Sequence, residues 1–318
     1  DLRFFSSCAL SSIGVIGAGL MGMAMAERLQ ACGQQVYLCD VDPARQALGR
    51  SLGMQVETAP AALALQCSRI LIVVLDALQV RDVLYGGSLA SPASPLPDRL
   101  LAALKHDHRI MFCSTVSPQE ASFACEQVTQ AGALALDTPI SGGPARARRG
   151  EISMMIAGPL ATSSSFAEVL DLLSTKKFYI SERYGDGSRA KLVNNLLAAI
   201  NLVGAAEAMA LGERIGLDPN MLLHLISESS GASWMLSHRM PRALGQEAGI
   251  TAQTHVLSKD VILANAMAGE LGLDLPLGAL AAAHMQATCD AGWREADDSA
   301  VFLWYQKRFI NPLPHIPT

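Results

Sequence analysis

The chain has 318 residues, of which 50% are hydrophobic and 17% are charged. That length is sufficient for two domains, each with a sizeable core. The net charge of −5 gives no general attraction to polyanions, so the composition argues against nucleic-acid binding. The densest basic cluster, Arg146, Arg148 and Arg149, is typical of a solvated loop, although a loop that faces an anion has the same composition.

The cysteines and histidines show no ligand pattern. Seven cysteines lack paired spacing and a CxxC motif, and seven histidines lack an HExxH motif. Scattered cysteines indicate reduced thiols and a cytoplasmic protein, and the sequence predicts no metal site. Residues 1–10 lack the basic region and cleavage site of a signal peptide. The longest uncharged runs contain asparagines or many glycines, so no membrane span is expected.

Short apolar runs alternate with helical stretches in the first part of the chain. The expected strands are Ile13–Ile16, Val36–Cys39, Ile70–Leu75, Arg109–Cys113, Ala133–Leu136, Ser153–Ala157 and Lys177–Ile180. This alternation predicts an α/β fold, with a Rossmann-type doubly wound parallel sheet over residues 11–180. Ligands of such sheets bind beyond the carboxyl ends of the strands. The polar residues expected along that rim are Asp40, Asp76, Ser114 and Asp137.

Strand patterns stop after about Tyr184, and helical patterns follow. A long helix is expected from Gly187 to Gly216 because it is rich in Ala and Leu and contains no proline. Pro219, Pro241 and Pro276 are interpreted as marks of helix starts. The pattern predicts an all-α domain over residues 185–318, joined to the first domain by the long helix. The further helices are expected at Pro219–Ser230, Trp234–Ala243, Thr254–Leu271, Pro276–Cys289 and Asp297–Lys307.

The stretch Gly17-Ala-Gly-Leu-Met-Gly22 follows a strand and opens a helix. Gly17 allows a tight turn, Gly19 lets the backbone approach a pyrophosphate, and Gly22 allows close packing of helix on strand. The first helical amides, from Leu20 and Met21 onward, can bind phosphate. The alternative, in which the glycines only shape a turn, is disfavoured by the strand before and the helix after.

Asp40 ends the second expected strand. A carboxylate there can accept hydrogen bonds from both ribose hydroxyls of a dinucleotide, and it repels a 2′-phosphate. No arginine occupies position 41 or 42. The sequence therefore favours NAD over NADP.

The segment from Asp137 to Pro144 contains Ser141, Gly142 and Gly143. A serine hydroxyl and close backbone amides suit a carboxylate ligand. The same residues can also make an ordinary turn, and spacing alone does not separate the two interpretations.

Lys191 lies in the first turns of the long helix, with Asn194 and Asn195 on the neighbouring face. A lysine with two amides is costly to bury on an apolar helix, so we expect Lys191 to face a cleft between the domains. A shielded lysine with a lowered pKa can act as general acid/base and take a hydroxyl proton as hydride leaves. Asn195 would orient the substrate or the lysine. A lysine that extends to solvent at a helix start is the alternative.

Two further polar sites are less specific. Lys259-Asp260 can be a second pair in the cleft, but the spacing alone favours an exposed ion pair. Trp234 can line a substrate pocket, although core packing is favoured for it.

Five segments together resemble the β-hydroxyacid dehydrogenase family, which includes 3-hydroxyisobutyrate dehydrogenase and is related to 6-phosphogluconate dehydrogenase. The resemblance extends from about Ile13 to Val301. The segments are GAGLMGMAMAERL, CSTVSP, DTPISGGPARARRG, GSRAKLVNN and SKDVILA.

The resemblance implies a role for each candidate residue. Lys191 would be the general acid/base and Asn195 its helper. The implied substrate contacts are Ser141, Gly142, Gly143, Lys259 and Trp234. The implied cofactor contacts are Gly17, Gly19, Leu20, Met21, Gly22, Asp40, Leu75, Asp76, Thr115 and Lys259.

Within the family, SSGASWMLSHRM, EADDSAVF and LDALQVRDVLYG are most similar to the L-threonate dehydrogenase branch. The expected activity is therefore NAD-dependent oxidation of a small hydroxycarboxylic acid. Oxidation of 3-hydroxyisobutyrate and reduction of tartronate semialdehyde would use the same motifs. A non-catalytic dinucleotide-sensing module is the alternative from another class. The apolar helical domain predicts a homodimer or homotetramer.

Overall fold

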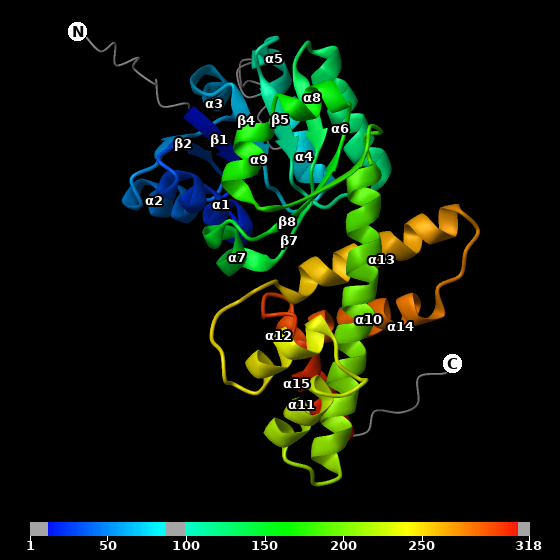
Figure 1. Ribbon diagram of the computed structural model, residues 1–318. Helices are drawn as coiled ribbons and strands as arrows, with labels where there is room; N and C mark the ends of the chain where they lie inside the picture. Colours follow the sequence, from blue (N-terminus) through cyan, green and yellow to red (C-terminus); the bar gives the residue numbers. More distant parts are fainter. Residues whose placement is uncertain (1–11, 87–98, 311–318) are drawn as a thin grey trace, which may run out of the picture. The chain divides into compact units, whose positions relative to one another are not determined.

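The computed structural model describes residues 12–86 and 99–310. The N-terminal residues on which the signal-peptide interpretation rests lie, up to residue 11, outside the described part. The chain divides into two compact units, residues 1–191 and residues 192–318. The division falls within the long helix α10 (Asp186–Arg214), so this helix contributes residues to both units (Figure 1).

The described residues of the first unit contain a sheet of nine strands. Its order is β3-β2-β1-β4-β5-β6-β8-β7, and β9 pairs with β8. The first six strands are parallel, as the sequence predicted. They are β1 (Ser12–Ile16), β2 (Gln35–Cys39), β3 (Gln55–Glu57), β4 (Arg69–Ile72), β5 (Arg109–Phe112) and β6 (Leu134–Asp137).

The far side of the sheet departs from the expected parallel arrangement. Strand β8 (Ser153–Ala157) runs antiparallel to β6 and to β7 (Ile140–Ser141), and β9 (Lys176–Ser181) runs parallel to β8. The reversal follows a short helix, α7 (Gly143–Arg149), which ends at Gly150 with a left-handed φ of 71°. The sequence did not predict β3 and β7 because they have only three and two residues.

Strand β4 ends at Ile72, three residues before the predicted end at Leu75. The backbone amides of Val74 and Leu75 donate to side chains and not to a neighbouring strand. Val74 N donates to Ser114 Oγ at 2.9 Å, and Leu75 N donates to Gln79 Oε1 at 2.9 Å. The apolar run Ile70–Leu75 therefore extends beyond the C-terminal end of this strand.

Two hydrophobic layers enclose the sheet, because side chains of a strand alternate between its faces. Leu71 packs with α1, α7 and α9, whereas Ile70 and Ile72 pack with α3 to α6. This arrangement is the doubly wound sheet that the sequence predicted. The helices are α1 (Leu20–Ala31), α2 (Pro43–Ser51), α3 (Pro60–Gln66), α4 (Ala77–Tyr85), α5 (Leu100–Ala103), α6 (Pro118–Gln130), α7, α8 (Leu160–Ser164) and α9 (Ala167–Leu173).

The described part of the second unit is helical, as predicted. Its core is formed by apolar residues of α10 and of the helices that follow, among them Met209, Val261 and Tyr305. Those helices are α11 (Pro219–Ser227), α12 (Trp234–Ala243), α13 (Thr254–Glu270), α14 (Pro276–Thr288), a π-helical turn (Cys289–Trp293) and α15 (Ala300–Ile310).

Pro241 does not mark a helix start, so that part of the sequence interpretation is wrong. It lies inside α12, whose first turn is capped by Ser233, with Ser233 Oγ accepting from Leu236 N at 3.0 Å. Pro219 and Pro276 do stand at the first position of their helices, where a missing N–H costs nothing.

Helix α10 is the one helix of the described residues that is long and apolar enough to cross a membrane, judged by length and composition. Half of its most apolar stretch is buried inside the protein. A core helix of a water-soluble protein meets the same criterion, so the finding is weak evidence for a span.

Candidate active site

The glycine-rich loop between β1 and α1 is fixed by the protein's own backbone. Gly17 has a φ of 95°, and its amide donates to Cys39 O at 2.8 Å. A Cβ on Gly17 would lie 2.5 Å from Val73 O, and one on Gly22 would overlap Gly17 O. A Cβ on Gly19, in contrast, would meet no described atom within 4 Å. Gly17 and Gly22 are therefore required by the fold, whereas Gly19 borders open space.

Helix α1 begins at Leu20 with Gly19 as its N-cap, and no described side chain caps it. Helices α2 and α4, in contrast, have side-chain caps, since Asp42 accepts from Ala44 N and Asp76 accepts from Gln79 N. The first amides of α1 are orphan donors at the positive end of the helix dipole. They can bind a pyrophosphate, and the open side of Gly19 leaves room for it.

Asp40 fixes the end of β2 to the glycine-rich loop. Its Oδ2 accepts from Ala18 N at 2.5 Å and its Oδ1 accepts from Asp42 N at 2.8 Å. Each carboxylate oxygen retains a lone pair for a ribose hydroxyl. Arg45, one turn into α2, donates from Nη1 to Ala18 O at 2.8 Å. The sequence interpretation considered positions 41 and 42 only and therefore missed this cation beside the loop.

The other predicted cofactor residues lie after β4 and β5. Leu75 donates its amide to Gln79, and Asp76 Oδ1 accepts from Gln79 N at 2.9 Å as the N-cap of α4. Thr115 follows β5 and is partly exposed. In the described structure Asp76 thus has a structural role at the helix start.

The loop from β7 to α7 contains Ser141, Gly142 and Gly143. Gly142 has a φ of 132° and Gly143 a φ of 78°, which side chains rarely adopt. Ser141 pairs with Ser153 of β8 and stays partly exposed. The loop therefore offers a hydroxyl and glycine amides beyond the end of β6.

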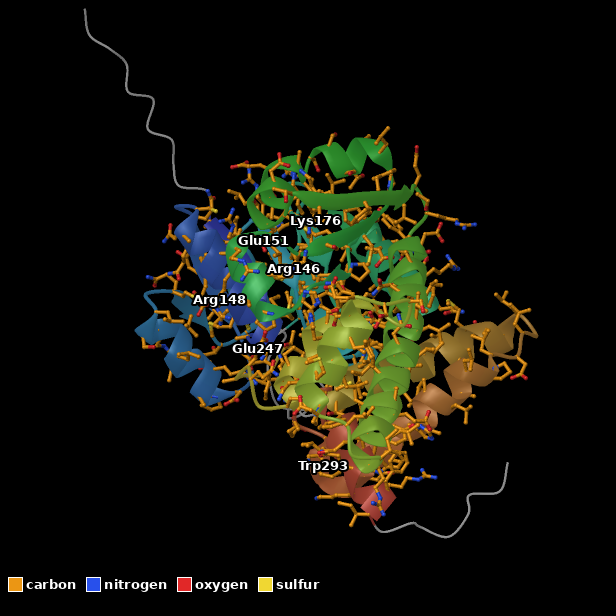
Figure 2. The ribbon with its side chains drawn as sticks, turned by 60° about the horizontal axis from the view of Figure 1, so that its bottom comes forward. Arg146, Arg148, Glu151, Lys176, Glu247 and Trp293 are labelled. Atoms are coloured by element: carbon orange, nitrogen blue, oxygen red, sulfur yellow. The ribbon has the colours of Figure 1, made fainter. Side chains whose placement is uncertain are left out.

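The basic cluster forms part of α7 and meets acidic partners. Arg148 pairs with Glu27, and Arg149 Nη2 lies 2.9 Å from Glu151 Oε2. Arg149 lowers the pKa of Glu151, and Arg146 and Lys176 contribute to the same shift. Figure 2 shows Arg146, Glu151 and Lys176 in one region of the first unit. These pairs favour the solvated interpretation of the cluster.

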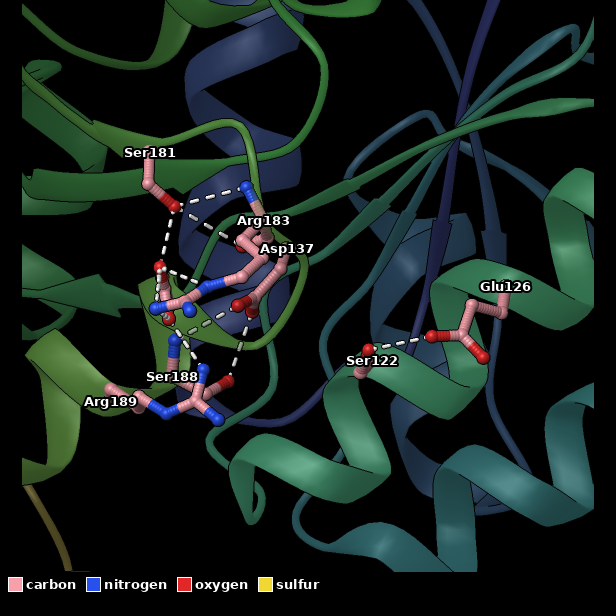
Figure 3. A network of polar contacts seen from close by, with 8 residues as sticks. Ser122, Glu126, Asp137, Ser181, Arg183, Ser188 and Arg189 are labelled. Atoms are coloured by element: carbon pink, nitrogen blue, oxygen red, sulfur yellow. Dashed lines mark hydrogen bonds and ion pairs between the residues drawn. The ribbon is translucent and has the colours of Figure 1, made fainter.

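Lys191 lies near the start of α10 and is 5% exposed. The helix start is fixed by Asp137 at the end of β6, whose Oδ2 accepts from Ser188 N at 3.0 Å and whose Oδ1 accepts from Ser188 Oγ at 2.9 Å (Figure 3). Burial raises the pKa of Asp137 to about 6, although hydrogen bonds from Ser188, Gly185 and Gly187 lower it. Lys191 is therefore not a lysine that extends to solvent.

In the second unit, Asn195 belongs to a network of hydrogen-bonded polar side chains. Asn195 Nδ2 donates to Asp260 Oδ2 at 2.6 Å, and Lys259 Nζ donates to Asp260 Oδ1 at 2.7 Å. Asn194 Nδ2 donates to Asn195 Oδ1 at 2.9 Å. Asp260 is 1% exposed, so the interpretation of Lys259-Asp260 as an exposed ion pair is wrong. The sequence missed this link because Asn195 and Asp260 are 65 residues apart.

Lys259 also lines a pocket of about 220 Å³, together with His255, Gln286 and Arg294. Trp234, in contrast, is 43% exposed, so the favoured interpretation of core packing is wrong for it. Its ring stacks on His238 with centroids 4.1 Å apart, and the Arg239 guanidinium lies 5.4 Å from it.

The predicted site residues thus form two groups, each within one unit. The first unit holds the glycine-rich loop, Asp40, the Ser141–Gly143 loop and Lys191. The second unit holds Asn195, Trp234 and Lys259. No cluster of metal-ligating side chains occurs within residues 12–86 and 99–310, and the prediction of no metal stays a prediction.

Two family models match the chain. The NAD binding domain of 6-phosphogluconate dehydrogenase matches residues 12–181, and the NAD-binding domain of NADP-dependent 3-hydroxyisobutyrate dehydrogenase matches residues 185–305.

Individual relatives match over most of their length. L-threonate dehydrogenase of Cupriavidus necator is 34% identical over 91% of this chain and 94% of its own. Mitochondrial 3-hydroxyisobutyrate dehydrogenase of Mus musculus is 30% identical over 95% of this chain and 89% of its own. The crystal structure of 3-hydroxyisobutyrate dehydrogenase from Salmonella typhimurium is 28% identical, with a TM-score of 0.82 over 92% of this chain and 99% of that chain.

A Rossmann-type sheet, an uncapped helix behind a glycine-rich loop, and a helical second unit define a dinucleotide-dependent dehydrogenase. Together with these matches, they show that the chain belongs to the β-hydroxyacid dehydrogenase family, the NAD(P)-dependent hydroxyacid dehydrogenases. The matches support NAD as cofactor and leave NADP open. Gly19 and the first amides of α1 fit the pyrophosphate of such a cofactor.

Replacing Gly19 or Gly22 by alanine should distinguish a glycine that leaves room for the cofactor from a glycine that the packing of the protein requires. Gly19→Ala meets no protein atom, so the variant should fold normally but bind NAD at least about tenfold more weakly. Gly22→Ala should lower the free energy of unfolding by on the order of 3 kcal/mol. Thermal unfolding and NAD titration by calorimetry measure both. Unchanged NAD affinity of Gly19→Ala would contradict the assignment.

Asp137 should give the protein a distinctive pH dependence of stability. The pKa of its carboxyl group is about 6 in the folded protein, above its ordinary value of 3.8, so the unfolded chain releases this proton first as pH rises. The contribution of Asp137 to stability is fully present below about pH 4 and is lost toward pH 6, by about 3 kcal/mol in total. The Asp137→Asn variant has no carboxyl group at this position, so its free energy of unfolding should not fall by this amount between about pH 4 and pH 6.

Urea unfolding of both proteins between about pH 4 and pH 7 tests the effect, because all other titrating groups cancel in the difference. Parallel stability curves for the wild-type protein and Asp137→Asn would show that the carboxyl does not titrate in this way.

Proposed function

We propose that this protein oxidises a small hydroxycarboxylic acid with NAD, and that L-threonate is its substrate. The class of reaction follows from the family. Support for L-threonate comes from the 34% identity to the Cupriavidus necator enzyme of that name, and from 30% identity to the enzyme of that name from Haemophilus influenzae. The observation that carries the mechanism is the burial of Lys191, three residues after Ser188, whose backbone and hydroxyl donate to Asp137 at the end of β6.

In this proposal Ser141 donates its hydroxyl to the substrate carboxylate, and the amides of Gly142 and Gly143 complete the cradle. Lys191 Nζ takes the proton of the substrate hydroxyl as general base. NAD, when bound, would supply the acceptor for the hydride of the carbon that carries this hydroxyl. In the reverse direction Lys191 returns the proton as general acid.

Asn195 is proposed as the helper of this step, because its amide is already oriented. Its Nδ2 donates to Asp260 and its Oδ1 accepts from Asn194, which leaves one N–H and one lone pair for substrate or lysine. Lys259 and Trp234 are proposed as further substrate contacts, with Lys259 also near the cofactor. We propose residues 11–180 as the NAD-binding domain and residues 185–318 as the substrate and oligomerisation domain.

Asp40 supports NAD over NADP, since a 2′-phosphate beside this carboxylate would be repelled. Arg45 Nε lies 3.6 Å from Asp42 Oδ2, so part of its charge is balanced by a second carboxylate. The proposed cofactor contacts otherwise remain those of the glycine-rich loop, Leu75, Asp76 and Thr115.

Oxidation of 3-hydroxyisobutyrate is the second candidate, because the mouse enzyme of that name is 30% identical over 95% of this chain. The two acids share a carboxylate and a hydroxyl, so the same residues would serve either. We further propose a cytoplasmic location, where the six described cysteines, all free thiols, stay reduced.

We propose a homodimer or homotetramer, because α10 exposes apolar residues that water solvates poorly. Three residues of α10, and Ile215 directly after it, are each more than half exposed; the three are Val193, Leu197 and Leu211. Leu277 and Leu280 of α14 are equally exposed. Faces of this kind on several helices of one unit indicate burial against another copy of the chain.

The Lys191→Ala variant should lose turnover by at least about a thousandfold, since it lacks the proton acceptor, while NAD affinity stays within about twofold. Absorbance of the reduced nicotinamide measures turnover with L-threonate, D-threonate, D-erythronate, D-glycerate and 3-hydroxyisobutyrate, with NAD and NADP offered separately.

Near-normal turnover of Lys191→Ala would contradict the mechanism. Activity of the wild-type enzyme on 3-hydroxyisobutyrate alone would replace L-threonate by the second candidate. A preference for NADP would contradict the role of Asp40.

Light scattering should give a mass of two or four times 33.6 kDa. Leu211→Glu should reduce this mass, because it places a charge on the exposed apolar face of α10. Leu65 on α3 of the first unit is more exposed than Leu211, so Leu65→Glu is the control and should leave the mass unchanged. A monomeric wild-type protein would contradict the proposal.

A further inference from the structure

We propose that Asp137 and Ser188 are a positioning pair for Lys191. The carboxylate at the end of β6 fixes the first turn of α10, and through it the place of the Lys191 ammonium group. The inference rests on the proposed function, in which Lys191 is the acid/base. It adds two residues that do not touch the substrate but act through the lysine.

The first observation is that one residue makes two hydrogen bonds to one carboxylate. Ser188 donates from its backbone to Asp137 Oδ2 at 3.0 Å and from its hydroxyl to Asp137 Oδ1 at 2.9 Å. A single bond leaves the helix start free to rotate about it, whereas two bonds to different oxygens fix the rotation. Asp137 is 1% exposed and Ser188 is fully buried, so water does not compete for either bond.

The second observation is the close approach of the helix start to the sheet. A Cβ on Gly187 would lie 2.7 Å from Met155 O and 2.8 Å from Asp137 O. The backbone of Gly187 and Gly185 also donates to the Asp137 carboxylate. The amides of the helix start thus balance the buried charge, and no side chain other than hydrogen fits at position 187.

Helix geometry connects this fixed turn to Lys191. Lys191 follows Ser188 by three residues, which places both side chains on one face of α10, about 4.5 Å apart along the axis. Side chains on a helix lean toward its N-terminus, so the Lys191 side chain extends back along the turn that Asp137 fixes. Any rotation or shift of that turn therefore moves the lysine directly.

A buried carboxylate is a costly way to hold a helix, because an apolar contact of similar volume is often equally stable. The carboxylate also fixes the orientation of the helix start, because its two oxygens accept hydrogen bonds from two different groups of Ser188. The requirement for direction is strongest where a reacting group must be placed to within a fraction of an ångström.

The same helix start offers a matched control. Asp186, the first residue of α10, accepts from Ser181 Oγ at 2.6 Å and from Arg183 Nε at 3.1 Å. This second cluster includes Arg183 and Arg189, whose side chains are 78% and 46% exposed. Ser181→Ala removes a serine-to-carboxylate bond of the same kind as Ser188→Ala, but it leaves Asp137 untouched.

Ser188→Ala should lower kcat by about 10- to 100-fold, because a shift of about 1 Å at a reacting group has an effect of this size. KM for the hydroxyacid and Kd for NAD should stay within about threefold, since Ser188 contacts neither ligand in the proposal. Ser181→Ala should keep kcat within about twofold. Asp137→Asn keeps an acceptor and a donor for Ser188, so it should retain far more kcat than Asp137→Ala.

The double variant Ser188→Ala/Lys191→Ala tests whether Ser188 acts through the lysine. Its residual rate should equal that of Lys191→Ala alone, which is the non-additivity expected of one functional unit. A further loss in the double variant would overturn the proposal. If Ser188→Ala does not fold, Ser188→Cys keeps the volume with a weaker donor and should lower kcat in the same direction.

The outcomes separate this inference from the function on which it rests. If Lys191→Ala keeps turnover, the acid/base assignment fails, and the positioning role fails with it. If Lys191→Ala is inactive but Ser188→Ala retains the wild-type kcat, only the positioning role is overturned. Equal losses of kcat in Ser188→Ala and Ser181→Ala would overturn the positioning role, because they would show that Asp137 and Ser188 only stabilise the helix start.

Discussion

The candidate site depends on the attachment of one long helix to the end of one strand. Helix α10 has 29 residues, and its first turn is held by the buried carboxylate of Asp137 on β6. Because an α-helix is stiff over a few turns, this contact would in our proposal also set the direction in which Lys191 leaves the helix.

The glycine-rich loop shows how the demands of a fold and of a ligand can be told apart. Gly17 and Gly22 are required by neighbouring backbone atoms, whereas Gly19 has no described neighbour in the direction of a side chain. A glycine at a position where the protein itself would tolerate alanine, between two glycines where it would not, indicates space for a ligand. The uncapped amides of α1 lie at the same place, and both features suit a pyrophosphate.

Local patterns in the sequence predicted the parallel strands, the long helix and the glycine-rich loop, because each depends on residues close together in the chain. They did not predict the reversal at β8, which depends on a left-handed turn at Gly150. They also misjudged Asp260, whose burial depends on Asn195, and they overlooked Arg45, which reaches back to Ala18. These errors share one physical origin, since spacing along the chain carries no information on which distant polar groups meet.

The same distinction bears on the choice of substrate. The Ser141–Gly143 loop and Lys191 suit a carboxylate and a hydroxyl, which all acids of this class possess, so relatives with different substrates can share these residues. What differs between the acids is the remaining carbon chain and its hydroxyls. Discrimination between them must therefore come from side chains outside the shared motifs, because a missing polar partner is what makes a site reject a similar molecule. In our proposal Lys259 contacts the substrate, and the pocket that it lines with His255, Gln286 and Arg294 carries polar groups of this kind.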